Sequence, residues 1–438
     1  MTESVAISER RRKSFCVMPF LNAHVTTDGS IAPCCEYSGS LGNVRDMTLL
    51  DAWKGQALRD IRARFAEGEE VPGCWKCFER EAAGGTSMRT QTNKAFEPWR
   101  ERLLEADDPS AVAPAAPVRL DVRFSNICNF RCRTCWHGAS SKWFKDGVAI
   151  GVTAGPTAEI RSFAGVPALL AQLGESIDCL QSVYFAGGEP LLMQEHYSFL
   201  DLLIGRGRTD VELSYNSNMS ALSLGGQSVL DRWPKFASVK VAASIDASGE
   251  RGAYIRKEFD WDRFVRNIAI VRERCSHVEL SFGITVSVLN VLTLNDLIAH
   301  LMAKCAADPA SIYLNSLQDP PFYRTQVLPP WMKRKATRRL RRLRKDLLEV
   351  GRHDPDRENL AALGVAEVVQ FMNACQRDDQ SAALKENLVR LDSLRGESYQ
   401  RTLPELDGIW SNWRANAEKL RTLIGLSNRR QVHRGGAG

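Results

Sequence analysis

Strand-like and helix-like segments alternate along residues 118–317, and this alternation restricts the possible folds more than any other feature of the sequence. Short runs rich in apolar and β-branched residues predict six strands, at 118–124, 181–186, 211–215, 238–246, 277–287 and 311–317. The segments between them predict helices near 166–175, 196–205, 226–233, 260–275 and 293–306. Such alternation predicts an α/β fold with a parallel sheet, either an open doubly wound sheet or a partial barrel.

Two further regions flank this α/β unit. Residues 15–37 predict a hairpin that turns at Asp28-Gly29, and Thr48 predicts a helix N-cap with Asp51 as its capping-box partner. Residues 106–117 are rich in Ala and Pro, which is typical of a linker. We therefore expect an N-terminal α+β unit at 14–95, a linker at 96–117, the α/β unit at 118–320 and a helical extension at 321–438.

Positive charge is concentrated in one segment of the chain. The net charge is +6, yet residues 333–345 contain nine Lys and Arg and no acid, so the remainder is slightly negative. This balance argues against nucleic-acid binding by the whole surface. Leu340, Leu343 and Leu347 recur at helical spacing and predict a basic helix that packs through its leucines. The alternative is a contact surface for an acidic peptide, RNA or a membrane.

The 12 cysteines are too dilute for the disulfide scaffold of a small secreted protein. Residues 10–13 and the apolar run 15–25 resemble a signal peptide, but Pro19, Asn22 and His24 interrupt the run and no cleavage site follows. No apolar run approaches the ~18–20 residues of a membrane helix. We therefore expect a cytoplasmic protein without a membrane partner, in which clustered cysteines bind metal.

Three cysteines follow the first predicted strand with the spacing C-x3-C-x2-C: Cys128, Cys132 and Cys135. Three thiolates without an obvious fourth are typical of a [4Fe–4S] cluster with one iron left open. A zinc site would need four ligands, which His137 could complete, so a Cys3His zinc site is the alternative. The position favours catalysis, because parallel sheets and barrels place their active sites at the carboxyl ends of strands.

The second predicted strand ends at the same edge in Gly187-Gly188-Glu189-Pro190. Glycines there allow a close approach of the backbone to a ligand, and a glutamate can accept hydrogen bonds from an ammonium group. This motif alone is a weak indication of a ligand site. Its position, one βα unit after the cysteine motif, makes the combination of the two motifs specific.

Together these motifs resemble the radical S-adenosylmethionine (SAM) superfamily, and the resemblance covers roughly residues 118–317. It implies a partial (β/α)6 TIM-like barrel. It also implies that Cys128, Cys132 and Cys135 bind a [4Fe–4S] cluster whose open iron binds SAM. The SAM-binding residues implied by the resemblance are Gly187, Gly188, Glu189, Pro190, Asn216, Asn218, Ser244 and Arg256.

One residue of the cysteine motif departs from the family pattern. The residue before the third cysteine is usually aromatic or bulky and packs on adenine, but here it is Thr134. The resemblance then leaves Phe130 or Trp136 to stack on the adenine. His24 and His137 lie near cysteines in the sequence, and we expect them to orient other groups rather than act as bases.

A second set of cysteines lies before the barrel: Cys16, Cys34, Cys74 and Cys77. Four thiolates can bind a second [4Fe–4S] cluster or one zinc ion. The hairpin and helix between them resemble the twitch half of the SPASM auxiliary domain of radical SAM enzymes, which implies one auxiliary [4Fe–4S] cluster. Cys35 is the alternative to Cys34. The single cysteines, which we expect to be buried and inert, are Cys179, Cys275, Cys305 and Cys375.

The resemblance implies reductive cleavage of SAM to methionine and a 5′-deoxyadenosyl radical, which abstracts hydrogen from a substrate. A peptide or protein side chain is the expected substrate, because members with an auxiliary cluster commonly modify peptides. A small metabolite, such as a sugar, an amino acid or a nucleotide-like compound, is the alternative. The resemblance also implies an electron donor such as flavodoxin or ferredoxin. A protein that binds nucleic acid through residues 333–345 is a remote alternative, because it leaves the Gly-Gly-Glu-Pro motif unexplained.

Overall fold

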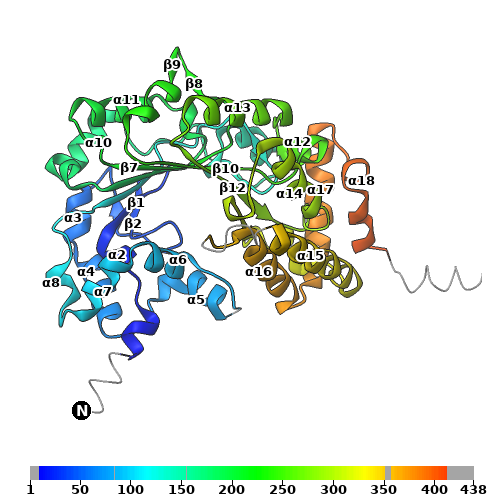
Figure 1. Ribbon diagram of the computed structural model, residues 1–438, viewed down its shortest axis with the longest axis horizontal. Helices are drawn as coiled ribbons and strands as arrows, with labels where there is room; N and C mark the ends of the chain where they lie inside the picture. Colours follow the sequence, from blue (N-terminus) through cyan, green and yellow to red (C-terminus); the bar gives the residue numbers. More distant parts are fainter. Residues whose placement is uncertain (1–8, 83, 154, 351–356, 412–438) are drawn as a thin grey trace, which may run out of the picture.

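The computed structural model describes residues 9–82, 84–153, 155–350 and 357–411. Within these residues, most strands belong to one curved sheet (Figure 1). In spatial order its strands are β13 (Ile312–Ser316), β12 (Glu279–Val286), β10 (Val239–Ser244), β7 (Glu212–Ser217), β6 (Ser182–Phe185), β4 (Arg119–Val122), β1 (Asn22–Val25), β2 (Ser30–Ala32) and β3 (Gly42–Asn43).

All six strands predicted for the α/β unit are present, and each pairs in parallel with its neighbours. Helices follow four of them, as predicted: α10 (Val166–Leu173), α11 (Gln194–Gly205), α13 (Trp261–Arg274) and α14 (Leu294–Cys305). In Figure 1, α10, α11 and α13 lie along one side of the sheet, while the N-terminal helices and the helical extension lie on its other side. This arrangement is the partial TIM-like barrel that the resemblance implied.

The prediction of a helix at 226–233 is wrong. That segment contains the second strand of a small hairpin, β8 (Ser223–Leu224) and β9 (Gln227–Ser228), followed by two 3-10 turns. Gly225 and Gly226 form the turn, and both have positive φ. Two positive-φ residues between paired strands are the signature of a type I′ hairpin, which glycine adopts readily. The loop expected at 145–162 begins with a short helix, α9 (Phe144–Ala149).

The strands of the sheet present one apolar and one polar face. Two rows of residues that are partners across β1, β4, β6 and β7 are buried against the helices: Ala23, Leu120, Val183 and Leu213; Val25, Val122, Phe185 and Tyr215. The alternate residues point to the opposite side, because side chains alternate along a strand. We call these the polar face: Asn22, Arg119, Ser182 and Glu212; His24, Asp121, Tyr184 and Ser214.

The predicted N-terminal hairpin is present as β1 and β2, with Gly29 at a positive φ of 86° in the turn. It is shorter than predicted, because the residues before it form α2 (Met18–Leu21). Thr48 caps α3 (Leu49–Lys54) with Asp51 in a capping box, as predicted. The next helix, α4 (Gln56–Ala66), begins directly after Gly55 and packs Ile61 and Phe65 into a local apolar cluster.

β1 pairs in parallel with β4, so the N-terminal hairpin extends the sheet of the α/β unit. The segment 96–117, expected to be a linker, contains α7 (Glu97–Glu105) and α8 (Pro109–Val112). Leu103 and Leu104 of α7 are buried in one cluster with Phe15 and Val118. The linker prediction is therefore wrong, because these leucines give the segment an apolar face to pack.

The described residues after the sheet are mainly helical, as predicted: α15 (Pro330–Val350), α16 (Leu360–Ala374), α17 (Ser381–Arg395) and α18 (Tyr399–Thr402). The rest of the extension predicted at 321–438, residues 351–356 and 412–438, lies outside the described residues. The predicted basic helix is α15. Leu340 and Leu347 are buried and Leu343 is partly buried. Most of its Lys and Arg side chains are exposed. α15 packs against α16, and α16 in turn packs against β13.

His196 on α11 makes stability sensitive to pH. It is fully buried, its Nε2 lies 3.0 Å from the Tyr215 hydroxyl, and burial lowers its pKa from 6.5 to about 3. Between these values only the unfolded chain binds the proton, so the free energy of unfolding falls as pH falls, by about 1.4 kcal/mol per pH unit. We expect His196→Gln to flatten this decline in urea unfolding between pH 6.5 and about 4.5. His300→Gln, at an exposed histidine, is the control. Equal slopes for all three proteins would contradict the assignment.

Candidate active site

The three cysteines of the C-x3-C-x2-C motif lie on a loop beyond β4. Cys132 belongs to the short strand β5 (Arg131–Cys132), which pairs with β11 (Arg256–Lys257). The thiols of Cys132 and Cys135 hydrogen-bond to each other, and Cys128 is near enough for its charge to act on Cys135. The loop therefore gathers all three thiols, as the sequence predicted.

The electrostatics of these thiols depend on burial and on one arginine. Burial raises the pKa of Cys128 to about 12. The Cys132–Cys135 hydrogen bond raises the pKa of Cys135 and lowers that of Cys132. Arg256 lowers the pKa of all three and pairs with Asp246, Nη1 to Oδ2, at 3.4 Å. Because metals bind thiolates, loading this site releases protons.

This donor set suits a cluster better than a single ion. Among the described residues, no three His, Cys, Asp or Glu side chains converge closely enough to bind one metal ion. Cluster thiolates each bind a different iron and so lie further apart than the ligands of one ion. The zinc alternative also needs His137, whose Nε2 instead lies 2.9 Å from the Ala158 carbonyl oxygen.

Gly187-Gly188-Glu189-Pro190 leaves β6 and runs beside the cysteine loop. The backbone N–H of Glu189 donates to the Ile127 carbonyl at 2.7 Å. A Cβ on Gly188 would lie 2.0 Å from that same carbonyl oxygen. Pro190 begins a buried 3-10 turn. Gly188 thus permits the close approach of the cysteine loop itself, whereas the sequence had suggested a ligand.

We expect Gly188→Ala to displace the cysteine loop, because the new methyl group overlaps backbone atoms that cannot rotate away. Overpacking of this kind costs about 1–3 kcal/mol. The measurement is iron content after anaerobic reconstitution, together with the urea midpoint. Gly205→Ala is the matched control, because a Cβ there meets nothing within 4 Å. Wild-type iron content and stability in Gly188→Ala would disprove the steric role.

Glu189 is buried behind the cysteine loop with its carboxylate nearly satisfied. Oε1 accepts from the Ser217 hydroxyl at 2.8 Å and from the Leu191 N–H at 3.2 Å. Oε2 accepts from the Asn218 N–H at 2.6 Å. Burial raises the pKa of Glu189 and these bonds lower it. One lone pair of Oε2 remains for a further donor, such as an ammonium group.

The other residues expected to bind SAM lie at the carboxyl ends of neighbouring strands. Asn216 is exposed near the end of β7, and Ser244 ends β10. Asn218 follows β7, and its Nδ2 lies 4.0 Å from the sulfur of Cys128. The structure thus brings Asn218, like Arg256 and Glu189, to the cysteine loop.

The two aromatic candidates for adenine stacking differ in exposure. Phe130 is 1% exposed and packs edge-to-face on Phe259, at 6.2 Å between ring centroids. Trp136 is 67% exposed. Of the two, Trp136 is therefore the residue with an accessible ring face.

The second cysteine set gathers in the N-terminal region. Cys16 precedes α2, Cys34 follows β2, and Cys74 and Cys77 flank the start of α5 (Trp75–Ala82). The charges of Cys74 and Cys77 act on Cys16, and those of Cys16 and Cys74 act on Cys34. Burial raises the pKa of Cys74 to about 12. These four residues form one group of thiols.

Cys35 points elsewhere. Burial is the largest cause of the raised pKa of its thiol, and the next largest are the charges of Asp121, on β4, and Arg123, directly after β4. The charges of Cys16, Cys74 and Cys77 are not among the main causes. This difference favours Cys34 over Cys35 as the fourth member of the second set.

Family models match both regions of the chain. Residues 16–78 match the iron–sulfur cluster-binding SPASM domain, and residues 122–303 match the radical SAM superfamily. The chain contains a radical SAM domain. It therefore has a SAM-binding [4Fe–4S] cluster and SAM as cofactors, with an auxiliary iron–sulfur cluster in its SPASM domain. None of the described helices has the length and apolar character to cross a bilayer.

The chain is also similar to solved structures at low sequence identity. Streptococcus suis SuiB bound to S-adenosylmethionine matches with 12% identity over 54% of this chain and 45% of its own, at a TM-score of 0.36. Native anSMEcpe with bound AdoMet matches with 16% identity over 53% and 62%, at 0.40. The matches therefore span less than two thirds of those proteins. At these sequence identities and TM-scores, the similarity does not indicate a shared function.

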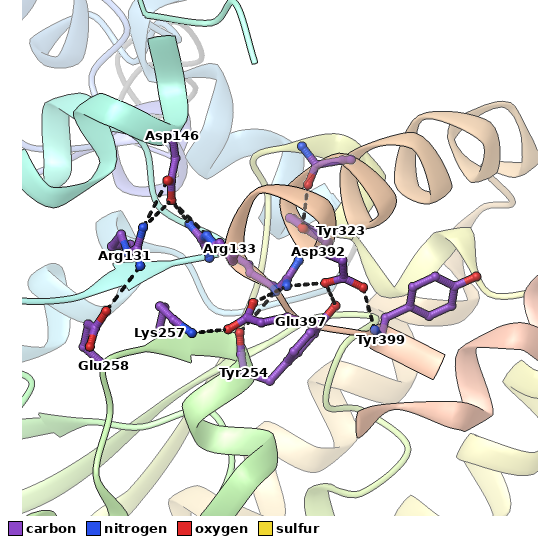
Figure 2. Close-up of polar contacts among 12 residues, drawn as sticks. Arg131, Arg133, Asp146, Tyr254, Lys257, Glu258, Tyr323, Asp392, Glu397 and Tyr399 are labelled. Carbon is purple, nitrogen blue, oxygen red and sulfur yellow. Dashed lines mark hydrogen bonds and ion pairs between the residues drawn. The ribbon is translucent and has the colours of Figure 1, made fainter. Parts of the chain in front are cut away.

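The radical SAM domain is joined to the helical extension by buried charges (Figure 2). Arg133, between the second and third motif cysteines, is 1% exposed. Its Nη2 donates to Asp392 at 2.5 Å and to Glu397 at 2.6 Å, and its guanidinium lies 3.7 Å from the ring centroid of Tyr254. Tyr254 donates from its hydroxyl to Asp392 at 2.8 Å. We call these four residues the Arg133 cluster.

A second contact joins α17 to the same loop. Arg395 donates from Nε to Asp146 at 2.9 Å, and Arg131 donates to the same carboxylate at 3.1 Å. The indole of Trp143, beneath Arg395, donates to the Cys132 carbonyl at 2.6 Å. Local sequence patterns gave no signal for the contacts with α17, since Arg133 and Asp146 have these partners more than 200 residues away along the chain.

Sequence reasoning also missed residues beside the second cysteine set. The guanidinium of Arg89 donates to the carbonyls of Lys13 and Phe15 and pairs with Glu81. Its charge lowers the pKa of Cys16 and Cys74, and the Ser87 hydroxyl does the same to Cys77 through a hydrogen bond. Both residues thus favour thiolates at this site.

Proposed function

We propose that this enzyme cleaves SAM reductively and uses the resulting 5′-deoxyadenosyl radical to abstract hydrogen from a peptide or protein side chain. The observation that carries the proposal is the grouping of three thiols on one loop with Arg256 and Glu189 beside them. The cofactors supply the electron transfer and the radical, and the protein binds, orients and shields them.

The roles of the residues follow from their contacts. Cys128, Cys132 and Cys135 would bind the SAM-binding cluster. The free lone pair of Glu189 suits the ammonium group of SAM, and the guanidinium of Arg256 suits its carboxylate. The remaining SAM contacts in this proposal are Gly187, Gly188, Pro190, Asn216, Asn218 and Ser244.

The auxiliary cluster would be bound by Cys16, Cys34, Cys74 and Cys77. In this proposal residues 14–95 form the auxiliary unit, and 118–320 form the catalytic barrel. An external donor such as flavodoxin or ferredoxin would supply the electron. The SPASM match supports a peptide substrate, because that auxiliary domain commonly accompanies peptide modification.

A labelling experiment tests the reaction and the substrate class together. Protein reconstituted anaerobically with iron and sulfide is incubated with SAM, dithionite and a fully deuterated extract of the encoding organism that lacks this gene. We expect 5′-deoxyadenosine, and deuterium in it only when the extract is present. Protease digestion of the extract should abolish the deuterium transfer. Transfer that survives digestion would instead support a small metabolite, and absence of 5′-deoxyadenosine would refute the proposal.

A further inference from the structure

The polar face of the sheet holds buried polar atoms that have no hydrogen-bond partner among the described residues. Asn22, Asp121 and Ser182 are 1%, 3% and 6% exposed, and each has such an oxygen. The Nε atom of Arg119 is also buried and without a hydrogen bond, and that of Arg123 makes no hydrogen bond beyond its ion pair with Asp121. A buried polar atom without a partner costs about 1–3 kcal/mol. This concentration on neighbouring strands therefore indicates a ligand site.

One of the two arginines of this site has no carboxylate of its own among the described residues. The carboxylate of Asp121 contacts two residues: one oxygen lies 3.0 Å from His24 Nδ1, and the other lies 3.8 Å from Arg123 Nε. Glu36 also acts on Arg123. By contrast, Arg119 has no carboxylate within ion-pair distance in the part of the chain that the structure describes.

Aromatic rings hold Arg119 in place. Its guanidinium lies 6.0 Å from the ring centroid of Phe96 and 5.6 Å from that of Tyr184. Such packing orients the planar group while leaving its N–H edge free for an acceptor. A held guanidinium without a carboxylate at ion-pair distance among the described residues is typical of carboxylate or phosphate recognition.

The site lies between the two cysteine sets. At one end, a Cβ on Gly187 would lie 3.1 Å from Cβ of Arg123, so this arginine adjoins the Gly-Gly-Glu-Pro segment. At the other end, Cys35 is beside Asp121, and its neighbour Cys34 belongs to the second thiol group. A molecule bound here would contact the surroundings of both cofactors.

We propose that Arg119 and Arg123 bind a carboxylate of the substrate on the polar face, while Asp121 accepts a hydrogen bond from a neighbouring donor of that substrate. This inference rests on the proposed function, because it assigns the substrate's position. The carboxylate belongs either to a peptide side chain or to a small carboxylic acid, and the two sources are distinguished below.

Cys35 supplies a readout that does not depend on turnover. Its thiol is half-buried beside Asp121 and Arg123. A carboxylate bound to the arginines would cover the thiol and slow its alkylation. Cys179 and Cys375, which the sequence predicted to be buried, are exposed in the structure, so they serve as internal references in the same protein.

The reconstituted enzyme is treated anaerobically with N-ethylmaleimide, and each cysteine is followed by peptide mass spectrometry. We expect succinate, but not neutral succinamide at equal ionic strength, to slow alkylation of Cys35 and to leave Cys179 unchanged. Equal effects of the two probes, or no effect of either, would overturn the proposal. This comparison uses the wild-type enzyme, so it does not depend on the folding of a variant.

A variant series identifies the residue. Arg119→Met should weaken protection by succinate about tenfold or more, as expected for a lost hydrogen bond to a charged group. Arg206→Met, at an exposed arginine 3.6 Å from Asp178, should leave protection unchanged. Full protection in Arg119→Met would overturn the assignment.

Two capped tripeptides distinguish the sources of the carboxylate. Acetyl-Ala-Glu-Ala-amide should protect Cys35 at lower concentration than succinate if the source is a peptide, and at higher concentration if it is a small acid. Its Gln counterpart should not protect. Formation of 5′-deoxyadenosine is measured separately, so loss of SAM cleavage with intact protection would refute the proposed function and leave the carboxylate site standing.

Discussion

Replacement of Cys128, Cys132 and Cys135 together by alanine is expected to abolish 5′-deoxyadenosine formation and to lower the iron content from about eight to about four atoms per chain. The three thiols are the only candidate ligands on this loop among the described residues, since His137 is engaged by the Ala158 carbonyl. Iron and sulfide assays of the reconstituted protein, with chromatography of the SAM products, make the measurement.

Two matched controls separate cluster loss from general damage. Cys275→Ala and Cys305→Ala remove buried thiols that lie outside both cysteine sets, and they should retain all of the iron and activity. Replacement of Cys16, Cys74 and Cys77 together by alanine should remove the other iron atoms, about four per chain. If either triple variant retained about eight irons, the ligand assignment for that set would be wrong.

Arg133→Met is expected to lower the free energy of unfolding by about 3–5 kcal/mol, as when one partner of a buried ion pair is removed. The substitution leaves the carboxylate of Asp392 buried without its cation, while Glu397 keeps its pair with Lys257 at 2.8 Å. Burial of an unpaired charge is costly, whereas methionine retains most of the arginine volume. Urea unfolding under anaerobic conditions measures the change.

The carboxylate left without a cation provides the control. Neutralising it in the double variant Arg133→Met, Asp392→Asn should recover part of the stability, although each single change destabilises. Lys345→Met, at an exposed pair with Glu349 on α15, should change stability by less than about 0.5 kcal/mol. Equal effects of Arg133→Met and Lys345→Met would mean that the Arg133 cluster does not join α17 to the barrel.

The Arg133 cluster connects the helical extension to the cysteine loop of the candidate active site. Because Arg133 lies between two motif cysteines and Trp143 bonds to the Cys132 carbonyl, α17 restrains the cysteine loop from behind. We expect loading of the cluster and docking of α17 to stabilise each other. Limited proteolysis of Arg133→Met should therefore cut near α17 faster than in the wild type.

Local patterns in the sequence predicted much of the fold. Each of the six strands is a short apolar run, and the cap at Thr48 depends only on residues within one helical turn. The error at 226–233 has a local cause too, since the positive φ of Gly225 and Gly226 turns the chain into a hairpin. Motif spacing likewise predicted the cysteine loop, because all three residues lie within eight positions.

Contacts between distant segments could not be predicted in this way. The pairing of β1 with β4 joins segments about 100 residues apart, so a separate N-terminal unit seemed the simpler reading of the sequence. The choice between Cys34 and Cys35 depends on which way two adjacent side chains point, and spacing alone cannot decide it.

The sequence by itself determined the family, the barrel strands and both cysteine sets, because these depend on short-range periodicity and spacing. Only the tertiary structure decided which faces and neighbours those residues have. It placed Arg133 against Asp392 and Glu397, and it placed Arg119 on the polar face with no carboxylate of the described residues at ion-pair distance. The physical reason is that burial and charge pairing depend on what folds against a residue, and that partner is often hundreds of positions away.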